Sequence, residues 1–319
     1  MLVQRSCGTR IVTLTGRGGD MRIASEISER ILTAANNVEL GKGDGKYRHR
    51  GSAVSRCSRE MVLHAMGVPW TNPPNPLHGD QVVFHQGHDI EDRIISYMEG
   101  AGIPVGCGQM EVTGFTPFHD LAVKGHIDGI AFMPEDSPLA GKWLLFDVKS
   151  AGTFGYKKVQ GDRNGDPNEN HRKQLEVYAF SYVTDRSEKY DGVRGTRLCD
   201  LRFDGYEFGG CMVVYCSKER PTVYMRGGGK KELPRIHTCI FDVDEIDHDV
   251  TMEHFDLVEE HIKAGTIPSI PDRGDEMVWG RVDKKTGAKT AARCDPRWCK
   301  RYDACQGKVP LEDIIVRED

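Results

Sequence analysis

An acid and a base stand two residues apart where an apolar run of the sequence ends. Residues 143–146 are Trp, Leu, Leu and Phe, and Asp147-Val148-Lys149 follows them directly. The apolar run predicts a buried β-strand, and residues i and i+2 of a strand point to the same face. We therefore expect the strand end to present a carboxylate beside an ammonium group. Because this tripeptide also occurs in ordinary surface strands, it indicates chemistry only if further polar residues join it.

Further acids precede this strand in the sequence. Asp128 lies in a strand-like pattern, and a hairpin of the two strands would bring it beside Asp147. Upstream, His88 and Glu91 are three residues apart in a predicted helix, hence on one face. Two or three carboxylates suit Mg²⁺ or Mn²⁺, which prefer oxygen ligands. Such an ion polarises a phosphodiester and generates hydroxide, while the ammonium group of Lys149 could orient the attacking water.

The order of these motifs resembles the PD-(D/E)xK nuclease superfamily. More narrowly, it resembles the RecB-like exonucleases, including the CRISPR-adaptation exonucleases and their phage relatives. The matching motifs, within residues 52–305, are Gly87 to Glu91, Asp128-Gly129, Asp147-Val148-Lys149 and Gln174-Leu175-Glu176-Val177-Tyr178. The resemblance implies a phage-type chain with a restriction-endonuclease-like core.

The resemblance also assigns roles to single residues. It implies that Glu91, Asp128 and Asp147 contact the divalent ions, with the carbonyl of Val148 as a further ligand and Lys149 as the catalytic lysine. His88 is either a second ligand from the first motif or a histidine of the helix surface. Gln174 and Tyr178 are four residues apart on a predicted helix and share a face. In the family this pair lies beside the active site and helps to place the DNA strand or the lysine.

Three cysteines lie close together near the C-terminus. Cys294, Cys299 and Cys305 fall in a polar, basic segment where core packing is a poor explanation. A tetrahedral zinc site or a 4Fe-4S cluster needs a fourth ligand. A cluster-bearing branch of the same family has one cysteine before the nuclease core and three after it, which implies Cys57. The first spacing, four residues where relatives often have two, leaves Zn²⁺ as the alternative to an iron-sulfur cluster.

The remaining cysteines within the predicted nuclease region occur mostly in apolar or strand-like contexts. We expect them to be small buried hydrophobic residues, as is usual for cysteine in a protein interior. They are Cys107, Cys199, Cys211, Cys216 and Cys239.

The elements that must position these motifs predict an α/β fold with a central mixed β-sheet flanked by helices. Periodicity predicts helices over residues 21–40, 52–70, 85–103, 168–183 and 251–265. It predicts strands over residues 108–115, 121–133, 142–150, 209–218 and 235–244. The expected organisation is an N-terminal extension over 1–40, a single nuclease domain over 41–305 whose two ends the metal cluster joins, and a tail over 306–319.

Composition narrows the classes of function. The chain has 319 residues, of which 38% are hydrophobic and 29% charged, as in globular proteins. It shows no apolar run of about 18 residues and no signal peptide pattern, so we expect a cytoplasmic protein without a membrane segment. The net charge of −5 argues against general coating of nucleic acid. Basic residues nevertheless cluster within 42–59 and 281–301, so a local positive groove is still expected.

Together these features predict a metal-dependent DNA exonuclease that serves recombination, repair or degradation of DNA. By resemblance, it acts on single-stranded DNA ends with 5′ to 3′ polarity. The chain has no GxxxxGK[ST] motif, so a helicase or recombination protein would be a separate partner, and a homo-oligomer stays open. Two alternatives are a non-catalytic protein that binds DNA ends and a zinc-containing endonuclease of the same fold.

Overall fold

The structure, a computed structural model, describes most of the chain between residues 47 and 305. The described residues are 47–71, 80–157, 167–183, 195–224, 229–243, 248–269 and 301–305, with 30, 159, 281–282, 289–290 and 307. Residues 1–42 and 75–85 form one compact unit, and residues 43–74 and 86–319 form another. The second unit contains the site described below. Nearly all of the predicted helix over 21–40, the predicted tail over 306–319 except residue 307, and Cys294 and Cys299 lie outside the described residues.

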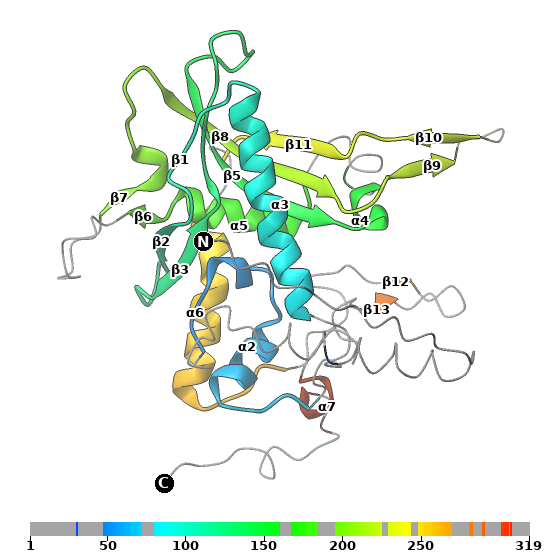
Figure 1. The fold of residues 1–319 in the computed structure, drawn as a ribbon. Helices are drawn as coiled ribbons and strands as arrows, with labels where there is room; N and C mark the ends of the chain where they lie inside the picture. Colours follow the sequence, from blue (N-terminus) through cyan, green and yellow to red (C-terminus); the bar gives the residue numbers. More distant parts are fainter. Residues whose placement is uncertain are drawn as a thin grey trace, which may run out of the picture. The chain divides into compact units, whose positions relative to one another are not determined.

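The centre of the second unit is a mixed five-stranded sheet, as the sequence predicts (Figure 1). Its strand order is β1-β4-β5-β8-β11, in which β5 and β8 pair in parallel and the other neighbours pair antiparallel. The strands are β1 (Val105–Gly106), β4 (Gly129–Phe132), β5 (Lys142–Ala151), β8 (Glu207–Ser217) and β11 (Ile236–Phe241).

Strand β5 is buried on both faces, which explains its unbroken apolar sequence. Trp143 and Leu145 belong to the core on one side of the sheet. Leu144 and Phe146 belong to the core on the other side. Asp147 continues the buried run and is 3% exposed. The predicted buried strand is therefore confirmed, and it carries an acid into the protein interior.

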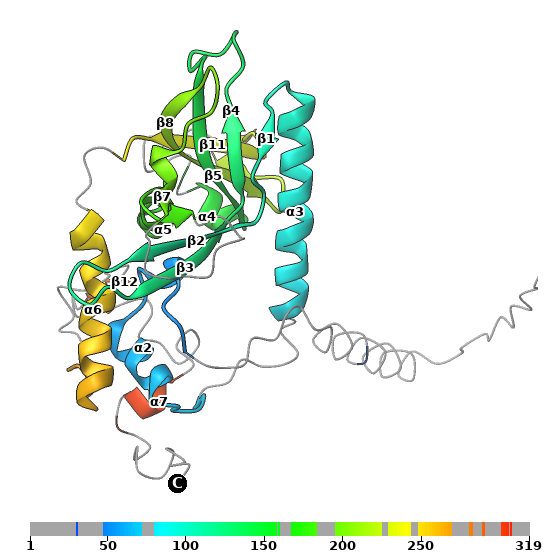
Figure 2. The same ribbon diagram turned by 90° about the vertical axis from the view of Figure 1, so that its left-hand side faces the viewer.

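Helix α3 (Asp80–Gly100) packs on one face of the sheet (Figure 2). Ile94 and Met98 are buried against Leu144 and Phe146. Ile90 and Ile95 pack at the edge of the same cluster, so that the apolar stripe predicted from the 3.6-residue period is confirmed.

On the other face of the sheet lie α4 (Thr153–Lys157) and α5 (Glu169–Ala179), and α6 (His248–Ala264) packs against α5. Apolar residues of all three helices join the larger core. Helix α5 begins after Asn168, whose side chain accepts a hydrogen bond from the backbone N–H of Asn170 at 3.0 Å. This N-cap satisfies one of the unpaired amides of the first turn and fixes where the helix starts.

A second, antiparallel sheet has the order β3-β2-β6-β7. Its strands are β2 (Met110–Phe115), β3 (Ala122–Ile127), β6 (Tyr182–Val183) and β7 (Thr196–Arg197). The single strand predicted over 121–133 is thus divided, because β3 pairs with β2 while β4 pairs with β5. Asp128 is the residue between the two parts. The predicted hairpin is confirmed, since Gly129 lies opposite Phe146 in the β4–β5 ladder.

The remaining described elements are short. They are η1 (Gly51–Ala53), α2 (Ser58–Ala65), η4 (Leu198–Asp200), β9 (Thr222–Tyr224), β10 (Lys230–Glu232), β12 (Arg281–Val282), β13 (Lys289–Thr290) and α7 (Tyr302–Cys305). The helix predicted over 52–70 is therefore shorter than expected and begins after Cys57. No helix in the described part of the chain is both long and apolar enough to cross a membrane.

Two glycines make room for the ring of Tyr178, which α5 directs toward β3. A Cβ atom on Gly125 would lie 2.3 Å from the Tyr178 ring, and one on Gly51 would lie 2.5 Å from it. Real Cβ contacts are essentially never this short, so any side chain at either position displaces the tyrosine. Because Gly51 and Gly125 have no side chains, they determine how closely α5 approaches the second sheet.

We expect Gly125→Ala to destabilise the protein by about 1–3 kcal/mol, the usual range for overpacking a core. Urea denaturation measures the effect. Gly152→Ala is the matched control, because its Cβ would meet no atom within 4 Å and should change stability little. Equal stability of Gly125→Ala and wild type would contradict this packing.

Candidate active site

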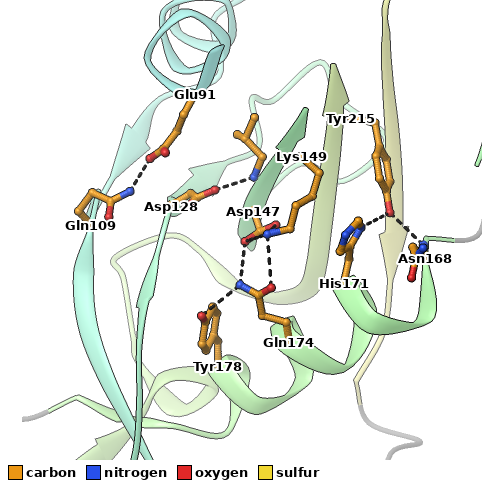
Figure 3. A network of polar contacts seen from close by, with 11 residues as sticks. Glu91, Gln109, Asp128, Asp147, Lys149, Asn168, His171, Gln174, Tyr178 and Tyr215 are labelled. Atoms are coloured by element: carbon orange, nitrogen blue, oxygen red, sulfur yellow. Dashed lines mark hydrogen bonds and ion pairs between the residues drawn. The ribbon is translucent and has the colours of Figure 1, made fainter. Parts of the chain in front are cut away.

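The end of β5 places a buried carboxylate and an ammonium group in direct contact (Figure 3). Lys149 Nζ donates a hydrogen bond to Asp147 Oδ1 at 2.9 Å and lies 2.7 Å from Oδ2. Burial raises the pKa of Asp147, and the neighbouring Lys149 opposes that rise. The predicted acid-base pair thus exists, and it lies on the α5 side of the sheet.

Gln174 on α5 holds this pair from the helix side. Its amide oxygen accepts a hydrogen bond from Lys149 Nζ at 3.3 Å. Its Nε2 donates to Asp147 Oδ1 at 3.2 Å and to the hydroxyl of Tyr178 at 3.1 Å. The partners define the amide orientation, since a flipped amide would turn its oxygen toward the carboxylate. Gln174 therefore fixes the positions of both the acid and the base.

Tyr178 is buried by these same neighbours and the two glycines, with 3% of its surface exposed. Burial raises the pKa of its hydroxyl, and the charge of Asp147 adds to the rise. The phenol therefore stays protonated. Tyr178 lies between the second sheet and Gln174, where its hydroxyl orients the Gln174 amide.

Asp128 lies beside this group at the junction of the two sheets. Its Oδ2 accepts a hydrogen bond from the backbone N–H of Val148 at 2.7 Å. Burial raises the pKa of Asp128 to about 7, and the negative charges of Asp147 and Glu91 add to that rise. Acids from β5 and from α3 thus act on the carboxylate at the junction of β3 with β4.

Glu91 lies on α3 with 14% of its side chain exposed, and His88 lies one turn before it. The distance from His88 Nδ1 to Glu91 Oε2 is 3.6 Å, and 63% of the His88 side chain is exposed. Both alternatives for His88, a ligand and a surface histidine, remain predictions. Gln109 donates a hydrogen bond from Nε2 to Glu91 Oε1, a contact that no sequence motif indicates.

A second hydrogen-bonded group supports the start of α5. The hydroxyl of Tyr215, which lies opposite Lys149 in the β5–β8 ladder, accepts a bond from the Asn168 N–H at 2.9 Å. The same hydroxyl lies 2.9 Å from His171 Nδ1. The sequence did not indicate Tyr215 or His171, although His171 precedes Gln174 by three residues, the spacing of one helix face.

The residues present fit a divalent cation. Asp147 Oδ2 is buried and makes no hydrogen bond with the described residues, because the contact with Lys149 lacks hydrogen-bond geometry. The mutual repulsion that raises the pKa of Asp128 is what a bound cation would relieve. However, no three His, Cys, Asp or Glu side chains within the described segments are already spaced as metal ligands. The roles of the three acids and of the Val148 carbonyl as ligands stay predictions.

The two described cysteines of the predicted cluster come from segments that touch each other. Cys57 directly precedes α2, and Cys305 ends α7. Leu63 of α2 and Cys305 belong to one small hydrophobic cluster. Arg59 of α2 donates hydrogen bonds to the carbonyl oxygens of Cys305 and Pro268.

Arg301 makes a second connection between these segments. It donates to the carbonyl oxygen of Val68 at 2.6 Å and to Glu60 Oε1 at 2.9 Å. Side chains of the protein itself therefore join the two ends of the predicted nuclease region. The identity of any metal held there remains a prediction.

The other cysteines follow the sequence expectation in part. Cys211 and Cys239 are buried, and Cys199 and Cys216 are half-buried. Cys107 is exposed, so its expected burial is wrong. It lies in the turn between β1 and β2 with φ of 56°, where the chain leaves the sheet before its side chain can be covered.

Within the N-terminal basic cluster, the described arginines divide into exposed and structural ones. Arg48, Arg50 and Arg56 are exposed. Arg59 instead binds backbone oxygens of the C-terminal part, as described above. The charge of Arg50 acts on the Tyr178 hydroxyl, so an exposed guanidinium group lies near the candidate site.

Comparisons with known proteins give little help here. No protein family matches the chain, and no curated protein matches it. Among solved structures, the crystal structure of SSO0001 aligns with 90% of this chain and 98% of its own, at 11% identity and a TM-score of 0.41. Similarity at this level carries no functional conclusion, so function has to be inferred from the site.

The raised pKa of Asp128 predicts how the metal-free protein responds to pH. An aspartate side chain ordinarily titrates with a pKa of 3.8, whereas the pKa of Asp128 in the fold is about 7. Asp128 in the folded protein therefore takes up a proton as pH falls through about 7, and its contribution to stability rises from about pH 8 toward pH 5. Asp128→Asn removes this penalty and can still accept the bond from Val148. We expect it to raise the melting temperature in EDTA more at pH 8 than at pH 5.

Asp136→Asn is the control, since it removes an equal but exposed charge in the turn of the β4–β5 hairpin. We expect this variant to show little dependence on pH. A melting-temperature gain for Asp128→Asn that is the same at both pH values would contradict the assignment.

Proposed function

We propose that this protein is a metal-dependent DNA nuclease with a PD-(D/E)xK core of the RecB-like type. The observation that carries the proposal is the buried Asp147–Lys149 pair beside Asp128, held by Gln174. These are the residues of the sequence motifs, and they come from separate elements of the fold. A structural ion pair needs neither a second acid at the neighbouring strand end nor a third acid from α3.

Glu91, Asp128 and Asp147 would hold Mg²⁺ or Mn²⁺, with the Val148 carbonyl as a further ligand. Such an ion supplies Lewis-acid activation of the phosphodiester and a hydroxide at neutral pH. Lys149, bonded to Asp147, would present its ammonium group to the attacking water or the phosphate. Gln174 keeps this ammonium group in place through its amide oxygen.

Positive charge beside the site supports DNA as the substrate. Arg50 is exposed, and its side chain forms no hydrogen bond or ion pair with another residue that the structure describes. Its backbone pairs with Lys124 of β3. Lys124 and His126 are two residues apart in β3, so they point to the same face of the strand, which ends just before Asp128. Glu111 offsets the charge of Lys124 at 3.0 Å, so Arg50 is the stronger candidate for a phosphate contact. Single-stranded ends and 5′ to 3′ polarity follow from the family resemblance.

The cysteines Cys57, Cys294, Cys299 and Cys305 are proposed to bind a 4Fe-4S cluster, with Zn²⁺ as the alternative. The contact between α2 and α7 supports this, because it joins the segments that bear the first and last of them. The cluster would be structural. A separate helicase or recombination protein would supply single-stranded ends.

The rival function is that of a DNA-end-binding protein without catalysis. One observation favours it: Asp147 Oδ1 is hydrogen-bonded to Lys149 and Gln174, and among the described residues no three His, Cys, Asp or Glu side chains are spaced for a metal. Against it, a protein that only binds phosphates gains nothing from three acids near the backbone of DNA. Cleavage assays separate the two functions.

Lys149→Ala tests the active site. With Mn²⁺ and single-stranded DNA labelled at the 5′ or 3′ end, we expect wild type to release label and the variant to lose at least about 10²-fold in rate. Circular dichroism checks that the variant folds. The order in which the labels are released gives the polarity.

Lys142→Ala is the control for that assay, because it removes an exposed ion pair with Glu207 from the opposite end of the same strand. Its rate should match wild type. Binding of DNA without cleavage by wild type would favour the rival function instead.

Cys57→Ser and Cys305→Ser test the cluster. In protein purified without oxygen, each variant should lose most of its iron and acid-labile sulfide, because three thiolates do not complete the ligand set. The half-buried Cys216→Ser serves as control and should keep both. Zinc in place of iron would favour the zinc alternative, and unchanged iron in both variants would contradict the ligand assignment.

A further inference from the structure

We propose that Gln109 is a positioning residue that holds the carboxylate of Glu91 in place for the divalent ion. This inference rests on the proposed function, since it assumes that Glu91 is a metal ligand. It goes further by adding a residue that neither the sequence motifs nor the family resemblance indicates. Three observations support it: the hydrogen bond from Gln109 to Glu91, the left-handed backbone of the turn that contains Gln109, and the position of this turn beside Asp128.

The hydrogen bond joins two separate elements. Gln109 lies in the turn between β1 and β2, and its Nε2 donates to Oε1 of Glu91 on α3 (Figure 3). A glutamate side chain has three rotatable bonds, and ordering it costs free energy. With Oε1 held by Gln109, the carboxylate plane is defined before an ion arrives. The second oxygen, Oε2, lies 3.6 Å from Nδ1 of His88.

The backbone conformation of this turn is unusual for its residues. Gln109 has φ of 54° and Cys107 has φ of 56°, on either side of Gly108. Left-handed conformations are unfavourable for residues that have a Cβ atom, and they persist where the surrounding structure requires them. Glycine would adopt this turn without strain at both positions. A glutamine at position 109 is therefore explained by its side chain, which reaches Glu91, and not by the turn itself.

The turn also lies directly beside the other acids. Met110, the next residue, pairs with Ile127 at the end of β3, immediately before Asp128. A Cβ atom on Gly108 would lie 3.7 Å from the carbonyl oxygen of Asp128. Gln109 thus links α3, which carries one acid, to the strand end that carries the next. This link sets the position of Glu91 relative to Asp128.

The consequence is a specific contribution to metal affinity. Residues that orient metal ligands through hydrogen bonds typically account for about 10–100-fold in affinity. Removing the amide of Gln109 while relieving its backbone strain should therefore weaken metal binding without weakening the fold. A residue with a merely structural role would show the opposite pattern, a loss of stability with unchanged affinity.

Gln109→Gly and Cys107→Gly form a matched pair that separates the two roles. Both replace a left-handed residue of the same turn with glycine, but only the first loses the bond to Glu91. Mn²⁺ binding to the full chain is measured by isothermal titration calorimetry, and melting temperatures are measured in EDTA. We expect neither variant to melt below wild type, and we expect Gln109→Gly alone to bind Mn²⁺ about tenfold more weakly.

Equal Mn²⁺ affinity of Gln109→Gly and wild type would overturn the role of Gln109 while leaving the proposed nuclease intact. A lower melting temperature of Gln109→Gly with unchanged affinity would do the same and would assign the bond a structural role. Wild type that binds no Mn²⁺ would overturn both the positioning role and the proposed function. Weaker binding by Cys107→Gly to the same extent would also overturn the inference, because the turn and not the amide would then set affinity.

Discussion

The buried carboxylate of Asp147 is the constraint on which the rest of the site depends. An acid with 3% of its surface exposed is costly unless partners compensate its charge. Lys149 supplies the countercharge from the same strand, and Gln174 supplies a hydrogen bond from α5. Each partner in turn needs support: Tyr178 positions the amide of Gln174, and two glycines make room for Tyr178. The polar contacts that α5 makes at this site can therefore be traced to one charge at the end of β5.

The two sheets determine why acids gather at this point. β5 ends its apolar run at the place where the chain leaves β3 for β4, and Asp128 is the residue at that transition. Burial and neighbouring charge raise the pKa of Asp128 to about 7. In the metal-free site, the negative charges of the acids therefore repel one another. Such a site gains stability when a cation binds, because the cation removes repulsion that the fold has to tolerate. The proposed catalytic role and the local instability would then both result from the same arrangement.

Much of the fold and of the candidate site could be predicted from the sequence. Features that depend on contacts between residues distant along the chain could not. The apolar runs of β5 and the stripe of α3 encode their own burial, so strand, helix and the Asp128–Asp147 hairpin were all predictable. The division of 121–133 between two sheets was not, because the alternation of residues continues through Asp128 while the pairing partner changes. Gln109 carries no signal in the sequence because its chemistry depends on a contact with Glu91, 18 residues away. The exposure of Cys107 was not predictable either, because a turn can leave an apolar side chain uncovered.

The most direct measurement of the central claim is a crystal structure of the protein grown with Mn²⁺, with anomalous scattering used to locate the metal. We predict an anomalous peak in contact with Asp147 and Asp128, with Glu91 as a further ligand and Lys149 still within reach of Asp147. A structure at the same Mn²⁺ concentration with no peak at these acids, and with Lys149 and Gln174 still bonded to Asp147 as they are here, would contradict the account. The three acids would then be a structural charge network and not a metal site.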